Sequence, residues 1–180
     1  MDLTDALDHT FQHAQFVIDN VSADQYDNRT PCTEWTVRDL LGHTIGVVAG
    51  LGAAASGAAP QEFELGDDPG VQFREAAALA LAAWRTPGVL DRVIDAGPGP
   101  MPGKVLASIN LLDTATHSWD IATACGQPAT LPDAVAHAAL EASRSTISSE
   151  IRAGRFGPEV QAPSNADPTQ QLVAFLGRQP

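Results

Sequence analysis

The segment LLDTATHSWDIA (residues 111–122) places a carboxylate and an imidazole four residues apart in a run with helical periodicity. On an α-helix, Asp113 and His117 project from one face, one turn apart. The same face carries the apolar side chains of Leu106 and Ile109, so it is expected to face a protein core. Burying polar groups is costly unless they are satisfied, and a divalent metal is the simplest partner for this pair. The segment therefore predicts a core helix that contributes ligands to a metal site.

A second helix supplies the third candidate ligand. His43 lies within LLGHTIGVVAGLGAAA (residues 40–55), on an apolar stripe with Val47 that is also expected to face inward. Neighbouring helices of a bundle bring such residues to one point. One carboxylate with two imidazoles is the ligand set of a catalytic zinc site with one open coordination position. We therefore predict that His43, Asp113 and His117 bind one divalent ion, Zn²⁺ or Ni²⁺.

Other polar residues leave alternatives open. Asp120, one turn beyond His117, is either a partner that orients an imidazole N–H or one half of a salt bridge, for example to Arg38. His9 and His13 form a rival pair on the first helix, where His13 lies nearer the core edge and is a candidate pocket residue. A metal-free trio, in which the carboxylate is hydrogen-bonded by both imidazoles, is the alternative to a metal site.

The remaining chemistry-bearing side chains are assigned to packing or to the surface. Trp35 and Trp119 are expected to pack in the core rather than to form a platform for a substrate. Cys32 and Cys125 are too few and too far apart in sequence for a disulfide framework, so both are expected to be reduced thiols. His137 is expected at the surface of its helix.

Hydrophobic periodicity predicts an all-α protein, a four-helix bundle with an additional helix and an irregular C-terminal tail, in a single domain over residues 1–180. Loops are expected over residues 56–70 and 96–103, a short strand is an option over 89–95, and Asp167 is a candidate cap for a short last helix. The predicted long helices span residues 2–20, 36–55, 71–86, 104–125 and 132–152.

The second helix carries two further sequence signals. Thr36 and Asp39 have the spacing of a capping box at its start. Gly42, Gly46 and Gly50 fall four residues apart and form a smooth ridge that another helix can approach closely. A homodimer formed through this ridge, or through the helices that carry the tryptophans, is an open alternative to a monomer.

Composition excludes several classes of function. The chain has 180 residues, with 10 basic against 22 acidic side chains and a net charge of −12, so it is not expected to bind nucleic acid. It has no apolar run of about 20 residues, so no membrane partner is expected. The start, MDLTDALDHT, lacks the basic and apolar regions of a signal peptide. A cytoplasmic location is therefore expected.

Three stretches of the chain resemble a known family. TPCTEWTVRDLLGH (30–43), NLLDTATHSWDIATACG (110–126) and FGPEVQAPSNADPTQQLVAFLGRQP (156–180) are similar to the actinobacterial branch of the DinB-like superfamily. That branch is similar to the N-terminal domain of mycothiol-dependent maleylpyruvate isomerase. The resemblance implies a DinB-like four-helix bundle that binds one divalent metal through a histidine of the second helix and either a carboxylate-x-x-x-His pair or two histidines of a later helix. These ligands correspond to His43, Asp113 and His117.

The resemblance also implies a function. The isomerase relatives usually have Glu where this chain has Asp113, whose side chain is one methylene shorter. The metal is therefore expected to be displaced, to bind more weakly or to contact Asp113 through water. The implied activity is that of a metal-dependent enzyme that uses a low-molecular-weight thiol as co-substrate, in S-transferase or isomerase-like chemistry on a small electrophile. A non-catalytic metal-binding or sensing helical module is the alternative.

Overall fold

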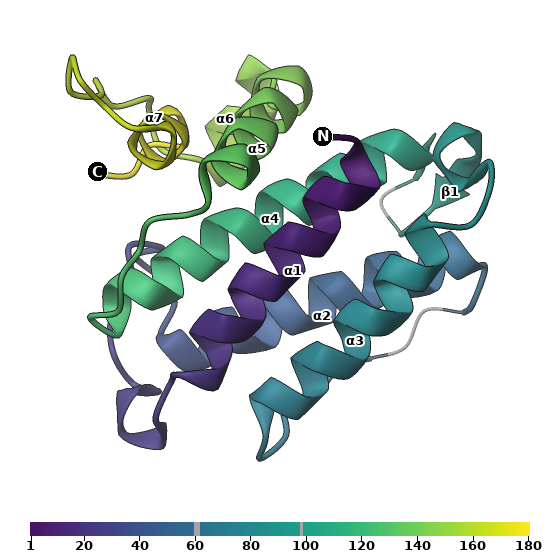
Figure 1. Ribbon diagram of the computed structural model, residues 1–180, viewed down its shortest axis with the longest axis horizontal. Coiled ribbons are helices and arrows are strands. Elements are labelled where there is room, and N and C mark those ends of the chain that lie inside the picture. Colours follow the sequence, from purple (N-terminus) through teal and green to yellow (C-terminus); the bar gives the residue numbers. More distant parts are fainter. Residues whose placement is uncertain (60–61, 98) are drawn as a thin grey trace.

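Four helices form the bundle expected from the sequence, in a computed structural model that describes residues 1–59, 62–97 and 99–180 (Figure 1). Helices α1 and α2 each pack against both α3 and α4, and the four surround one apolar core. The loops expected over 56–70 and 96–103 lie partly outside the described residues. The bundle helices are α1 (Leu3–Asp19), α2 (Val37–Ser56), α3 (Pro69–Trp84) and α4 (Gly103–Ala124).

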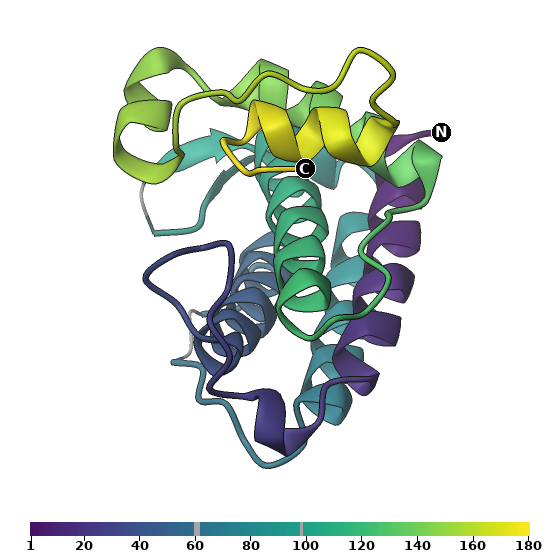
Figure 2. The same ribbon diagram turned by 90° about the vertical axis from the view of Figure 1, so that its left-hand side faces the viewer.

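Three further helices lie together beside the bundle, next to α4 (Figure 2). They are α5 (Asp133–Thr146), α6 (Ser149–Arg155) and α7 (Pro168–Phe175). A second apolar cluster joins them to the bundle, with Leu112 from α4, Leu140 from α5 and Leu172 from α7. The all-α class is confirmed, and the segment that follows the bundle contains α6 in addition to the helices predicted from residue 132 and after Asp167.

The helix predicted over residues 132–152 is wrong as one element, because the chain breaks into α5 and α6. Ile147 has an extended backbone between them, and Ser148 caps α6 by accepting a hydrogen bond from the Ile151 amide at 3.3 Å. The hydroxyls of Ser145 and Thr146 both donate to the Ala142 carbonyl, at 2.9 and 2.6 Å. Such side-chain bonds compete with the helical hydrogen bonds, and a cluster of hydroxyl residues favours a helix end over a helix interior.

The predicted helix caps are confirmed. The Asp39 amide donates to Thr36 Oγ1, and the Asp39 carboxylate accepts from the Thr36 amide at 2.9 Å, which completes the capping box of α2. At the other end, Gly57 has φ +81°, a left-handed conformation that glycine adopts at low cost. Asp167 caps α7 through the Gln170 amide at 2.8 Å. These caps fix the ends of α2, the helix that carries His43.

The expected glycine ridge on α2 is covered by a loop rather than by a helix. Side chains built at Gly42 and Gly46 would meet Leu65 and Phe63, and Gly50 faces open space. The close approach of two helices occurs at Gly52 instead, where an added Cβ would lie 2.7 Å from Ala80 Cα on α3. The helix surface at Gly42 and Gly46 is therefore covered by residues of the same chain and is not free to contact a second copy.

Substituting Gly52 tests this α2–α3 contact. Gly52→Ala is expected to lower the free energy of unfolding by about 1–3 kcal/mol, because the new methyl group meets backbone atoms of α3 that cannot rotate away. Gly50→Ala is the matched control, because a Cβ at this position of the same helix would have no neighbour within 4 Å. This substitution is expected to raise the free energy of unfolding by up to about 1 kcal/mol. Urea unfolding measures both, and equal effects of the two substitutions would contradict the contact.

A short hairpin leads into α4. The predicted strand over 89–95 is in part a 3₁₀ turn, Val89–Asp91, and in part strand β1 (Val93–Asp95). Strand β1 pairs antiparallel with β2 (Pro100–Pro102), with Val93 opposite Pro102. The Gly103 amide, at the start of α4, donates to the Arg92 carbonyl at 2.7 Å and fixes the entry of the chain into α4.

Helix α2 is also the one helix of the described residues with the length and apolar composition that a membrane crossing requires. The same properties are typical of core helices in proteins that do not span membranes. In this fold α2 packs between α3 and α4, and its polar Arg38, Asp39 and His43 interrupt the apolar sequence. An unbroken apolar run is therefore absent from α2, as the sequence predicts.

Candidate metal centre

The structure brings the three predicted ligands together. His43 comes from α2, and Asp113 and His117 from successive turns of α4. One ligand atom of each lies within 4.8 Å of the others. Their side chains are 32%, 18% and 12% exposed, so a small ligand can reach the group from the His43 side. The helical spacing in α4 and the inward stripe of α2 therefore meet as the sequence predicts.

Both imidazoles aim the same ring nitrogen at one carboxylate oxygen. His43 Nε2 lies 3.0 Å from Asp113 Oδ1, and His117 Nε2 lies 3.6 Å from the same atom. The two rings are perpendicular, with centroids 5.0 Å apart. The other carboxylate oxygen, Asp113 Oδ2, is buried and has no hydrogen-bond partner. Two convergent nitrogens and an unsatisfied carboxylate oxygen are the donor atoms that a divalent cation with nitrogen and oxygen ligands requires.

Asp120 orients the imidazole of His117. Its Oδ2 lies 3.0 Å from His117 Nδ1. A carboxylate can only accept here, so Nδ1 carries the hydrogen, and in the neutral ring Nε2 is left as an acceptor directed at Asp113. Histidine ligands of metals commonly have their second nitrogen held in this way by a carboxylate. Of the two roles predicted for Asp120, orientation of an imidazole N–H fits this geometry.

Asp120 also has the other role considered for it, one half of a salt bridge, but its partner is Arg178 and not Arg38, the arginine named as an example. Arg178 donates from Nε to Asp120 Oδ1 and from Nη2 to Oδ2, both at 2.7 Å. Arg38 instead lies over the ring of Tyr26, 5.6 Å from its centroid. Burial alone would raise the pKa of Asp120, but the hydrogen bonds from Arg178 and His117 outweigh burial and hold that pKa below its usual value.

Trp35 packs against the core, as the sequence favoured, and it also lies beside the candidate site. Its ring lies 4.6 Å from the ring of His43 and 6.0 Å from that of His117, centroid to centroid. It is half-buried and forms an apolar wall against both imidazoles. The one sequence feature that could have indicated this is the position of Trp35 just before α2, the helix that carries His43. Trp119 is buried in the core as predicted.

The cysteines are free thiols, as expected, and both are half-buried. Burial raises the pKa of Cys32, and the negative charge of Asp120 raises it further. Burial likewise raises the pKa of Cys125. Each thiol is therefore neutral near pH 7, and neither has the thiolate character of a reactive cysteine.

The rival histidines lie elsewhere. His9 and His13 of α1 line a separate cavity of about 390 Å³ together with Pro132 and Val135 at the start of α5. His13 is therefore a pocket residue, as predicted, but it is not in the group of potential ligands around Asp113. Burial lowers the pKa of His13. His137 is exposed on α5, as expected.

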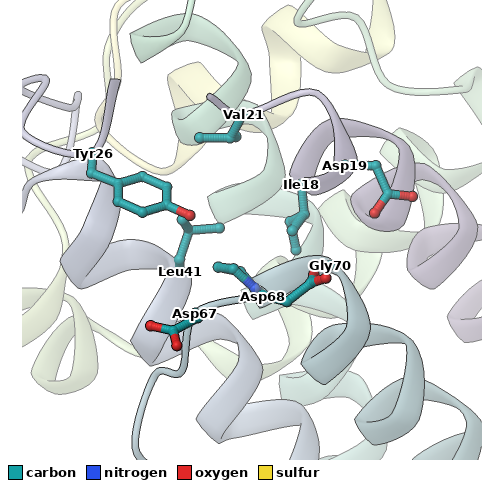
Figure 3. Close-up of a pocket in the computed structure, with 9 residues that line it drawn as sticks. Ile18, Asp19, Val21, Tyr26, Leu41, Asp67, Asp68 and Gly70 are labelled. Carbon is teal, nitrogen blue, oxygen red and sulfur yellow. The ribbon is translucent and has the colours of Figure 1, made fainter. Parts of the chain in front are cut away.

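A second cavity, of about 230 Å³, lies between the end of α1 and the start of α3 (Figure 3). Its walls combine the ring of Tyr26 with the carboxylates of Asp19, Asp67 and Asp68. Asp19 accepts from Gln15 at 2.8 Å, and Asp68 caps α3 through the Val71 amide at 2.9 Å. Two of the three carboxylates thus have structural partners, and none of these residues belongs to the group around Asp113.

Comparisons with known proteins agree with the predicted family. A sequence model of the "Mycothiol maleylpyruvate isomerase N-terminal domain" matches residues 12–122, a range that contains His43, Asp113, His117 and Asp120. "Uncharacterized protein Rv0738" and "Uncharacterized protein MT0763", from the H37Rv and CDC 1551 strains of Mycobacterium tuberculosis, are each 36% identical over 162 residues, and each match covers 88% of both chains.

Solved structures agree in fold. The crystal structure of the mycothiol-dependent maleylpyruvate isomerase has a TM-score of 0.48, and that of a histidine-to-alanine mutant of this enzyme has a TM-score of 0.50. Both are 13% identical to this chain and cover 77% of it, and the match spans 68% of those chains. At this identity the likeness concerns the fold alone. The family itself is established by the sequence matches: the chain belongs to the mycothiol maleylpyruvate isomerase N-terminal domain family.

Proposed function

We propose that this protein binds one divalent metal ion through His43, Asp113 and His117, and that it is a metal-dependent enzyme acting on a low-molecular-weight thiol. The observation that carries the proposal is the pair of Nε2 atoms directed at Asp113 Oδ1. With Nδ1 of a neutral His117 donating to Asp120, its Nε2 lone pair faces a carboxylate oxygen. Two acceptors repel each other unless a proton or a metal cation lies between them, and a divalent metal satisfies both.

The donor set suits more than one metal. Imidazole and carboxylate ligands bind both Zn²⁺ and Ni²⁺, so we propose one of these two ions. Three protein ligands leave a coordination position for a small molecule, as in catalytic zinc sites. The short side chain of Asp113 fits a cation held near the two imidazoles, and its buried Oδ2 is available as a second donor atom.

The thiol co-substrate is proposed from the family. The family description and the related crystal structure both name mycothiol-dependent isomerisation. A divalent cation held by these ligands would supply the positive charge that keeps a bound thiol deprotonated near neutral pH. The protein's own residues hold that site in place: Asp120 fixes the ring of His117, and the ring of Trp35 lies beside both imidazoles. The second partner is a small electrophile that the thiolate attacks.

Turnover measurements test the enzymatic part of the proposal. Purified protein is incubated with a low-molecular-weight thiol and a panel of electrophiles, after chelation and then with added Zn²⁺ or Ni²⁺. We expect conversion of an electrophile that requires both the thiol and the metal and that is lost in His117→Ala; S-transfer consumes the thiol, whereas isomerisation regenerates it. His137→Ala, which alters an exposed histidine on α5, is the matched control and should keep full activity. Turnover that is unaffected by complete removal of metal would contradict the proposal.

A non-catalytic metal-binding or sensing module is the second candidate. In the part of the chain that the structure describes, the group of ligand atoms within 4.8 Å of one another contains His43, Asp113 and His117 and no fourth histidine, cysteine or acidic residue. Metal binding without turnover on any electrophile would favour this module. A melting temperature that responds neither to chelator nor to added metal would favour the metal-free trio, because a ligand of the native state raises stability by mass action.

The remaining proposals concern the whole chain. We propose that residues 1–180 form one domain, because α4 contributes to both apolar clusters, with Leu111 in the first and Leu112 in the second. The net charge of −12 supports small-molecule partners rather than nucleic acid. We propose a cytoplasmic location.

A further inference from the structure

Arg178, near the end of the chain, makes a buried two-point contact with the residue that orients His117. Its Nε and Nη2 each donate to one oxygen of Asp120 at 2.7 Å. The Arg178 side chain is 10% exposed and that of Asp120 is fully buried. The remaining donor, Nη1, is 3.3 Å from the Leu176 carbonyl. A buried, bidentate pair of this kind fixes orientation as well as charge.

The end of α7 delivers this guanidinium to α4. After the helix, the Gly177 and Arg178 amides donate to the carbonyls of Ala174 and Val173, at 3.0 and 2.9 Å. Gly177 has φ +83°, and a Cβ there would lie 2.8 Å from the carbonyl carbon of Gly157, so glycine is required for both reasons. Leu176 is buried in the second apolar cluster. The position of Arg178 is therefore set by the docking of α7.

We propose that Arg178 is a positioning residue for the metal site, which acts through Asp120 on His117. This inference rests on the proposed function, since it concerns the same three ligands. The two hydrogen bonds from Arg178 fix the plane of the Asp120 carboxylate. Oδ2 is then directed at His117 Nδ1, 3.0 Å away, and Nε2 is left free to face Asp113. Without Arg178 the carboxylate can rotate, and the ring of His117 loses its fixed orientation.

The same contacts couple the site to the C-terminal segment in the reverse direction. If docking of α7 prepares the site for metal, binding of metal must stabilise the docked segment by the same free energy. Zn²⁺ is therefore expected to slow hydrogen exchange of the backbone amides of residues 173–178. In Arg178→Ala this protection should disappear, because the link between Asp120 and the segment is lost.

The affinity for Zn²⁺ and the visible spectrum of the Co²⁺-substituted protein test the proposal. Arg178→Ala is expected to weaken Zn²⁺ binding by about 10- to 100-fold and to change the Co²⁺ spectrum, because loss of a residue that orients a ligand typically costs that much. Arg178→Lys restores the charge without the two-point contact and should recover part of the affinity. Millimolar guanidinium ion can restore both the charge and the two-point contact, so it should raise the Zn²⁺ affinity of Arg178→Ala.

Arg152→Ala is the matched control. Arg152 also holds the C-terminal segment, by donating to the carbonyls of Phe175 and Gly157 at 2.8 and 3.1 Å, but it is not bonded to Asp120. We expect Arg152→Ala to lower the melting temperature while leaving the Zn²⁺ affinity within about twofold of wild type, because the docked segment remains the dominant state and the contact between Arg178 and Asp120 is retained. Equal affinities of the wild type and Arg178→Ala, or equal losses in Arg178→Ala and Arg152→Ala, would overturn the role of Arg178. A wild-type protein that binds no metal would instead overturn the proposed function.

Discussion

His43→Ala and His117→Ala are each expected to abolish stoichiometric binding of Zn²⁺ or Ni²⁺. Each substitution removes one of three ligands. Apparent binding free energies of four-ligand zinc-finger sites are about 10–16 kcal/mol, so an even share per ligand is about 2.5–4 kcal/mol. That corresponds to a loss of about 10²- to 10³-fold in affinity. Competition with a chromophoric chelator measures the affinity, and elemental analysis measures the stoichiometry.

The controls separate a lost ligand from a lost fold. His137→Ala alters an exposed histidine whose ring nitrogen lies 2.9 Å from the Asp133 carbonyl, so it should bind metal as the wild type does. The helical content of all three variants, followed by circular dichroism, should match the wild type, because His43 and His117 lie at the edge of the core. Tight binding of one ion per chain by both His43→Ala and His117→Ala would show that the ligands lie elsewhere.

Asp120→Ala is expected to lower the free energy of unfolding by about 3–5 kcal/mol, the largest stability effect predicted for a polar residue of this chain. The substitution leaves the guanidinium of Arg178 and the Nδ1–H of His117 without their acceptor in a buried position. An unpaired buried charge costs far more than the pair contributes. Chemical denaturation of the metal-free protein measures the effect without a contribution from metal binding.

Asp8→Ala is the matched control for burial. Asp8 accepts from Arg85 at 2.7 Å, the distance found for Asp120 and Arg178, but these side chains are 29% and 48% exposed. Exposed ion pairs contribute about 0–1 kcal/mol, so Asp8→Ala should have a small effect. The double variant Asp120→Ala/Arg178→Leu should regain part of the lost stability, because it removes the unpaired charge. Equal effects of Asp120→Ala and Asp8→Ala would contradict the importance of the buried pair.

Local sequence patterns predicted most of the bundle and the core of the candidate site. The periodic apolar residues of α1 to α4, the capping box at Thr36 and the cap at Asp167 depend on interactions within a few residues. The four-residue spacing of Asp113 and His117 fixes their common face in the same way. His43 could be predicted as a ligand because it lies on the apolar, inward-facing stripe of a neighbouring helix.

The parts that the sequence did not predict depend on contacts between distant segments. Arg178 reaches Asp120 across 58 residues, and only the docking of α7 brings the two together. Arg38 lies closer to His43 in sequence, and no local pattern distinguishes the two arginines. Trp35 is a large apolar residue of the kind usually found in cores. Its position beside the imidazoles depends on the path of the loop before α2, which the local sequence does not reveal. The break between α5 and α6 arises from hydroxyl side chains that periodicity alone does not weigh.

Elemental analysis of the purified native protein, together with His117→Ala, tests the central claim most directly. The account predicts one Zn²⁺ or Ni²⁺ ion per wild-type chain and less than about a tenth of that in the variant, given the expected loss in affinity. A wild-type protein that carries no divalent metal and takes up none after incubation with Zn²⁺ or Ni²⁺ would contradict it. The hydrogen-bonded trio of two histidines and one aspartate would then be a feature of the core alone.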